Sequence, residues 1–76
     1  MEEEKIAMQV LRNIAMDAGR MLAERQRAID ALTLFRESSV ETLEYIARKT
    51  DLEVLRDRSK LYLQRIKSGA VLSMSV

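Results

Sequence analysis

The sequence predicts an all-α protein, an antiparallel three-helix bundle, on the strength of three observations. The 76 residues contain no Pro and only two Gly, and they are rich in residues that favour helices. Apolar residues recur every three or four positions from end to end, as they do on one face of a helix. A chain of this length has room for one domain. We expect a bundle over 1–69, with helices at about 4–24, 27–49 and 51–68.

The first helix, at about 4–24, begins with the acidic run Glu2-Glu3-Glu4, which suits the positive end of a helix dipole. Its apolar stripe consists of Ile6, Ala7, Val10, Leu11, Ile14, Ala18, Met21 and Leu22. Met8 lies off the centre of this stripe. We expect the first turn at residues 24–27, because they are polar and Arg25 falls where the stripe calls for an apolar residue.

The second helix, at about 27–49, has a stripe that keeps its phase through two serines. The stripe consists of Ala28, Ala31, Leu32, Phe35, Ser39, Thr42, Leu43 and Ile46. We therefore expect one continuous helix, although Ser38 and Glu41 match a capping box that could start a helix at residue 39. A second alternative stays open, because a heptad seam from 7 to 46 is compatible with one long coiled-coil helix.

The third helix, at about 51–68, has the clearest ends. Thr50 followed three residues later by Glu53 matches a capping box. Gly69 suits the left-handed residue that follows a last turn. Beyond it, residues 70–76 form an uncharged apolar tail or a link to a following domain. The predicted core, where the helices meet, includes Leu32, Phe35, Leu55 and Ile66.

Composition excludes several classes of function. The chain has no Cys and no His, so it lacks the commonest general base and the commonest metal ligands. We therefore expect no catalytic residues, no metal and no cofactor. The 13 basic and 12 acidic residues are interspersed, which argues against a nucleic-acid partner. No apolar run approaches the ~20 residues that span a membrane, and the acidic N-terminus is unlike a signal peptide, so we expect a cytoplasmic protein without membrane insertion.

Apolar residues that the core does not need are the candidates for binding a partner. On the third helix Val54 and Leu61 lie one heptad apart, opposite the core stripe. On the second helix, one side of the stripe carries Leu34 and Tyr45, and the other side carries Ile29, Val40 and Ala47. One of these two sets should pack inside the bundle, leaving the other at the surface. Arg58 and Arg65 of the third helix could pair with acidic flanks of a partner. The predicted binding residues are therefore Leu34, Tyr45, Val54, Arg58, Leu61 and Arg65.

Two segments resemble those of MIT domains, the microtubule-interacting and trafficking domains. Ala31-Leu32-Thr33-Leu34-Phe35 is similar to the Ala-Leu-x-Leu-aromatic segment of that family's second helix, and Tyr62-Leu63-Gln64-Arg65-Ile66-Lys67 resembles its Tyr-Leu-x-Arg segment. The resemblance covers about residues 7–68. It implies a three-helix bundle that binds C-terminal tails of ESCRT-III-type subunits in membrane trafficking or scission. It also implies a cytoplasmic protein that is recruited to endosomal membranes.

The chain departs from that family in two places. Gln64 stands where members often have an acidic residue, and Arg25-Gln26-Arg27-Ala28 stands where they often have Gly or Asn before a Tyr. Two other functions stay open. The chain could be a coiled-coil or helical-hairpin oligomerisation module whose apolar seams are filled by its own copies. It could also be a docking subunit of a larger enzyme.

Overall fold

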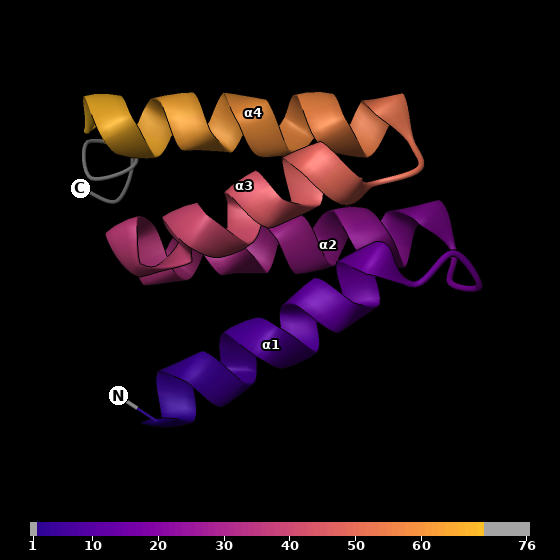
Figure 1. The fold of residues 1–76 in the computed structure, drawn as a ribbon, viewed down its shortest axis with the longest axis horizontal. Helices are drawn as coiled ribbons and strands as arrows, with labels where there is room; N and C mark the ends of the chain where they lie inside the picture. The colour runs from indigo at the N-terminus through magenta and orange to yellow at the C-terminus, as the bar shows by residue number, and fades with distance from the viewer. Residues whose placement is uncertain (1, 70–76) are drawn as a thin grey trace.

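A computed structural model describes residues 2–69, and the apolar segment predicted at 70–76 lies outside them. The described residues form four α-helices and one 3-10 helix. These elements are α1 (Glu2–Met16), α2 (Leu22–Leu32), η1 (Thr33–Ser39), α3 (Val40–Lys49) and α4 (Glu53–Ser68). Successive α-helices run in opposite directions along the long axis (Figure 1). The predicted all-α class and the compact antiparallel bundle are confirmed, while the bounds of the predicted helices need correction.

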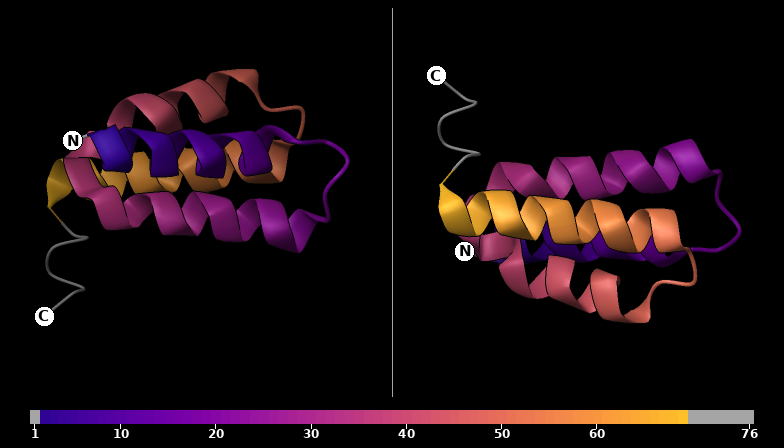
Figure 2. Two further views of the ribbon diagram at one scale, coloured as in Figure 1. Left: turned by 90° about the horizontal axis from the view of Figure 1, so that it is seen from below. Right: turned by 90° about the horizontal axis from the view of Figure 1, so that it is seen from above.

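The helices pack around one apolar core. α1 packs on α2 and α3, and α4 packs on α3 and α2. Figure 2 shows α2 and α3 on opposite sides of the bundle, with α1 and α4 between them. The largest side chains without exposed surface are Ile29, Leu32, Leu43, Ile46 and Leu55. Of the predicted core, Leu32, Leu55 and Ile66 are buried, whereas Phe35 is only partly buried at its edge.

The dimensions exclude the long coiled-coil helix. The radius of gyration is 11.6 Å and the longest extent is 35 Å. A single helix over residues 7–46 would be about 60 Å long at 1.5 Å per residue. The chain instead turns back after α1 and again after α2, so the heptad seam is distributed over α1, α2, η1 and α3.

The first turn lies at residues 17–21, and the prediction of a turn at 24–27 is wrong. Asp17 accepts a hydrogen bond from the Gly19 backbone N–H at 2.9 Å, which closes a tight turn directly after α1. The Met21 N–H then donates to the Glu24 side chain at 3.2 Å and caps the start of α2. The turn was missed because the apolar stripe continues through it without a change of phase.

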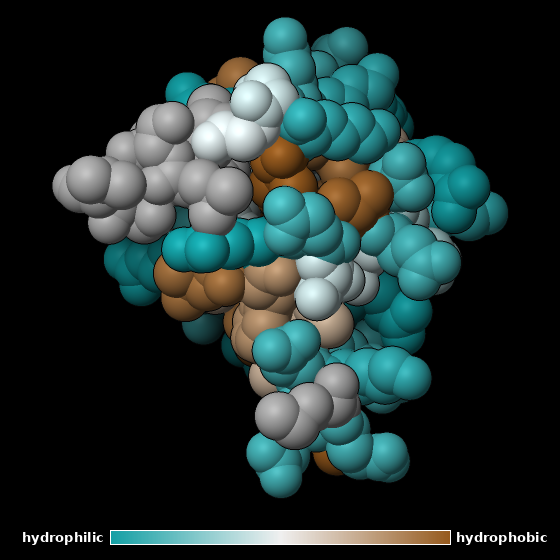
Figure 3. Space-filling model, turned by 90° about the vertical axis from the view of Figure 1, so that its left-hand side faces the viewer, coloured by the Kyte–Doolittle hydropathy of each residue, from teal (hydrophilic) through white to brown (hydrophobic). Residues whose placement is uncertain are grey.

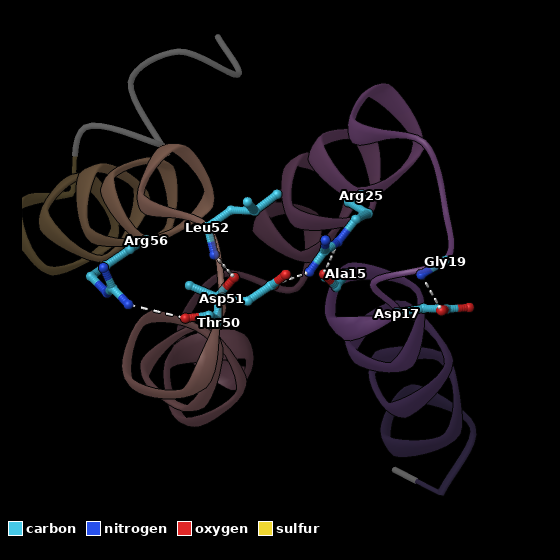
Figure 4. A network of polar contacts seen from close by, with 8 residues as sticks. All are labelled: Ala15, Asp17, Gly19, Arg25, Thr50, Asp51, Leu52 and Arg56. Atoms are coloured by element: carbon cyan, nitrogen blue, oxygen red, sulfur yellow. Dashed lines mark hydrogen bonds and ion pairs between the residues drawn. The ribbon is translucent and has the colours of Figure 1, made fainter.

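Arg25, the basis of the predicted turn at 24–27, is a buried residue of α2 with 2% of its surface exposed. Its Nε donates to the Ala15 carbonyl at 2.8 Å, and its Nη2 donates to Asp51 Oδ1 at 2.7 Å. Figure 4 shows the guanidinium between the end of α1 and the α3–α4 turn. Arg25 therefore joins α2 to the end of α1 and to the α3–α4 turn, and it lies inside a helix instead of ending one.

The helix predicted at 27–49 is divided at Arg36, so the expectation of a continuous helix is wrong. Arg36 has φ 51° and ψ −127°, which a helix cannot contain. These angles match the first central position of a type II′ turn, which favours Gly. The Ser39 hydroxyl donates to the Arg36 carbonyl at 2.7 Å, and α3 begins at Val40. The alternative start at residue 39 is therefore close to the observed one, although no side chain caps the helix there.

The last helix agrees best with its prediction. α4 begins at Glu53, two residues later than expected, and ends before Gly69, whose φ of 81° is left-handed. The Thr50 hydroxyl accepts the Leu52 N–H at 3.3 Å. In the predicted capping box it would accept the N–H of Glu53, one residue further on. Arg56 secures the α3–α4 turn by donating to the carbonyls of Ala47 and Thr50, at 3.1 and 3.0 Å.

A candidate protein-binding surface

The outer face of α4 carries the aliphatic pair that the sequence singled out. Val54 is 45% exposed and Leu61 is 44% exposed. They lie seven residues apart, two turns of helix, and therefore share one side of α4. The opposite side of α4 faces the core through Leu55, Ser59, Leu63 and Ile66, which are all buried. The pair is therefore not needed to hold α4 in the bundle.

Beside this pair, a polar cluster joins α4 to α2. Arg58 donates to both carboxylate oxygens of Asp30, from Nε at 2.7 Å and from Nη2 at 3.0 Å. The Tyr62 hydroxyl donates to Asp30 Oδ1, also at 2.7 Å. The Arg58 guanidinium lies over the Tyr62 ring, 5.9 Å from its centroid. Bidentate Arg–carboxylate pairing fixes direction as well as distance, so the cluster sets how α2 and α4 lie side by side.

Hydrogen bonding and burial in this cluster shift the pKa values of Asp30 and Tyr62. The hydrogen bond from Arg58 lowers the pKa of Asp30, and burial opposes this more weakly. Burial raises the pKa of Tyr62, and the hydrogen bond to Asp30 raises it further. Near neutral pH the carboxylate is therefore ionised and the phenol protonated, which is the state that the hydrogen bonds require.

The two predicted arginines differ in what they can offer a partner. Arg58 already has its acidic partner within the chain, in Asp30. Arg65 is half-buried near Tyr62, and its positive charge opposes the rise in the pKa of Tyr62. Towards α3, a shallow hollow of about 530 Å³ flanks the helix. It is lined by Lys60, Leu63, Gln64, Lys67 and Ser68. The exposed arc of α4 thus combines aliphatic side chains with charged neighbours of both signs, Asp57 among them.

Leu34 and Tyr45 lie on other parts of the molecule. Leu34 is in η1 and is 80% exposed. η1 belongs to the end of the bundle that Figure 3 faces, where apolar side chains alternate with hydrophilic ones. Tyr45 lies where α3 meets α1, with the Arg12 guanidinium 5.0 Å from its ring centroid. The set predicted on the other side of the second helix packs inward, since Ile29 and Ala47 are buried and Val40 is partly buried. The structure does not gather the six predicted residues into one site.

A second apolar surface, on α1, was not foreseen. Ile6 is 57% exposed and Val10 is 52% exposed, although both belong to the predicted core stripe. Met8 and Ala15 face the core instead, so α1 is rotated relative to the prediction. A signal was present in the sequence: the apolar stripe of α1 is wider than two neighbouring helices can cover. Residues 6, 10 and 14 form a row of their own at spacings of four.

Among residues 2–69, no three His, Cys, Asp or Glu side chains are placed to share a metal ion. No helix in this part of the chain is both long enough and apolar enough to span a bilayer. Comparison with protein-family models, with curated proteins and with solved structures finds no match.

Proposed function

We propose that the chain is a non-enzymatic protein-interaction domain that binds an amphipathic tail of another protein along the outer face of α4. The observation that carries this proposal is the exposure of Val54 and Leu61 on one side of a helix whose other side is fully packed. A partner helix in a groove places its apolar anchors at such spacings. Burying the pair would remove apolar surface from water, at about 25 cal/mol per Å².

The charges of α4 favour a tail with acidic flanks. The helix has five Arg or Lys residues and two acidic residues. Arg58 and Lys67 have partners within the chain, in Asp30 at 2.7 Å and in Glu44 at 3.7 Å. Arg65, one turn after Leu61, lies beside the aliphatic pair and could meet an acidic residue of the tail, while the exposed Asp57 lies on the other side of the pair. Charges at a rim mainly set encounter rate and specificity, so we assign most of the affinity to the aliphatic side chains.

The tails of ESCRT-III-type subunits are the class that the resemblance to MIT domains favours. The support for this choice is the similarity of residues 31–35 and 62–67 to that family, together with the all-α bundle. The division of the middle helix at Arg36 is a difference from three continuous helices. In this proposal the domain acts in the cytoplasm, and binding to such tails recruits it to endosomal membranes. An acidic tail of another kind would use the same face.

Amide chemical shifts test the proposal, because they locate the binding site. Titration with ESCRT-III C-terminal peptides should perturb α4 around Val54 and Leu61. Leu61→Asp should abolish the perturbation, since it places a charge among the aliphatic contacts, and it should leave the helical signal intact. Val10→Asp is the matched control, because Val10 is similarly exposed but lies on α1. Peptides that bind the Leu61→Asp variant as tightly as the parent would refute this site.

A further inference from the structure

The bundle consists of two helical hairpins joined by η1. The 17–21 turn joins α1 to α2, the 50–52 turn joins α3 to α4, and the most extensive packing is within each hairpin. α2 and α3, which η1 connects, lie on opposite sides of the bundle (Figure 2). Both hairpins supply the core, Ile29 and Leu32 from the first and Leu43 and Leu55 from the second. Each hairpin therefore needs the other in order to bury its apolar side.

Two ion pairs fix how the hairpins meet. Arg25 of α2 donates to Asp51 in the α3–α4 turn at 2.7 Å. Asp30 of α2 accepts from Arg58 of α4 at 2.7 and 3.0 Å. All four residues lie outside η1. The α3–α4 hairpin of another copy of the chain presents the same partners, so it can take the place of the chain's own hairpin and make the same two ion pairs.

The link between the hairpins is strained. Arg36 has φ 51° and ψ −127°, a region of backbone conformation that favours Gly. The seven residues of η1, Thr33–Ser39, contain neither Gly nor Pro, so nothing in them forbids a helix. The apolar stripe of residues 28–46 also keeps its helical phase across the link. Straightening η1 would join α2 and α3 into one helix over 22–49, about 42 Å long, and would remove the strain at Arg36.

We infer that η1 is a hinge through which two copies of the chain exchange hairpins. In the exchanged dimer α2, η1 and α3 form one helix, and the α3–α4 hairpin of each copy packs on the α1–α2 hairpin of the other. The core contacts between the α-helices and both ion pairs form again, now between copies, and the strain at Arg36 is relieved in each chain. Short links under strain favour domain swapping of this kind.

The exposed Leu34 gives the exchanged dimer a contact that the monomer lacks. Leu34 lies in η1, two residues before Arg36, and is 80% exposed. In each half of the dimer, the end of α2 and the start of α3 come from different copies but stay neighbours. The two straightened links therefore run antiparallel, side by side across the two-fold axis. Leu34 and its counterpart can bury apolar surface against each other there.

Paired substitutions at Arg36 test the hinge. After refolding from urea over a dilution series, sedimentation velocity should show the parent shifting from monomer to dimer as its concentration rises. Gly favours the positive φ of the monomer and Ala the helix of the dimer, so the dissociation constant of the dimer should be roughly tenfold or more higher for Arg36→Gly than for Arg36→Ala. A parent that stays monomeric at every concentration would overturn the inference, and so would equal association of the two variants.

Two controls accompany this comparison. Lys60 is exposed in α4, which is helical in both states, so Lys60→Gly and Lys60→Ala should dimerise equally. Hairpin exchange also goes beyond the proposed function, because it leaves the outer face of α4 unchanged. Leu61→Asp should therefore lose tail binding but dimerise as the parent does, and a failure of one proposal is distinguishable from a failure of the other.

Charge reversal at the Asp30–Arg58 pair distinguishes exchanged hairpins from two bundles that only touch. Asp30→Arg and Arg58→Asp each place like charges on α2 and α4 of their own chain. In an exchanged dimer of one copy of each variant, α2 of either copy meets the opposite charge on α4 of the other. Native mass spectrometry after joint refolding should therefore show the mixed dimer well above its random share. A random distribution, or the absence of a mixed dimer, would overturn the exchange.

Discussion

At the scale of single residues, Arg25 shows how a charged side chain can belong to a core. An unpaired charge in an apolar interior costs several kcal/mol, so a buried Arg must have its donors satisfied. Here the Ala15 carbonyl at the end of α1 needs a donor, and Asp51 supplies a countercharge from a position that is about half exposed. The polar character of Arg25 was visible in the sequence, but its two partners, ten and 26 residues away, were not.

Removing the Arg25 side chain should destabilise the whole bundle. We expect Arg25→Ala to lower the free energy of unfolding by about 2–4 kcal/mol, since it leaves a cavity and an unbonded carbonyl. Arg25→Met should lose roughly half as much, because it refills the space but makes no hydrogen bond. Asp51→Asn should cost least, because Asp51 is exposed and can be solvated. Urea titration measures these differences, and an Arg25→Ala variant with the midpoint of the parent would contradict the assignment.

At the scale of elements, the sequence predicted helices better than the turns between them. The ends of α4 were recognisable because Gly69 and the 50–53 segment act locally. The Asp17–Gly19 turn and the break at Arg36 leave the apolar phase unchanged, so periodicity alone could not detect them. The side of α1 that faces the core was not predicted correctly for a related reason: when the apolar stripe of a helix is wide, the sequence does not indicate which half of the stripe is buried. The Val54 and Leu61 pair was foreseen because the α4 stripe is narrow.

The backbone at Arg36 gives a prediction about the break between α2 and α3. Its φ of 51° is unfavourable for any residue with a Cβ atom. Arg36→Gly and Arg36→Ala lose the same side-chain interactions, so comparing the two isolates the backbone strain. We expect the Gly variant to be more stable than the Ala variant by about 1 kcal/mol or more.

The same pair of substitutions at exposed Lys60 within α4 is the control for Arg36. There Gly should be less stable than Ala by about 1 kcal/mol, because Gly gives up more conformational freedom in a helix. Thermal or urea unfolding measures all four variants. The same order of stability at both positions would show that the chain does not turn at Arg36 in the way described.

At the scale of the whole molecule, two ion pairs join α2 to the second half of the chain. Asp30 of α2 meets Arg58 of α4, and Arg25 of α2 meets Asp51 of the α3–α4 turn. These contacts complement the apolar core between α2 and α4, and the aliphatic side chains on the outer sides of α1 and α4 stay exposed.

These two carboxylates should make the stability of the bundle fall in acid. The pKa values of Asp30 and Asp51 are both lowered from an ordinary value of 3.8, chiefly by hydrogen bonds from Arg58 and Arg25 respectively. At pH values between the lowered pKa values of the folded chain and the ordinary value of 3.8, the unfolded chain therefore binds more protons than the folded chain. Their contribution is complete above the ordinary pKa and is lost as the pH falls through the lower folded values.

The free energy of unfolding, measured by urea titration between about pH 6 and pH 2, should therefore decrease as the solution becomes more acidic. Asp30→Asn and Asp51→Asn should each be less stable than the parent near neutral pH and should each show a shallower decrease. The double variant should have the flattest profile, because it lacks both titrating carboxylates. If the double variant loses stability in acid as steeply as the parent, these two carboxylates are not the groups that link α2 to the rest of the bundle.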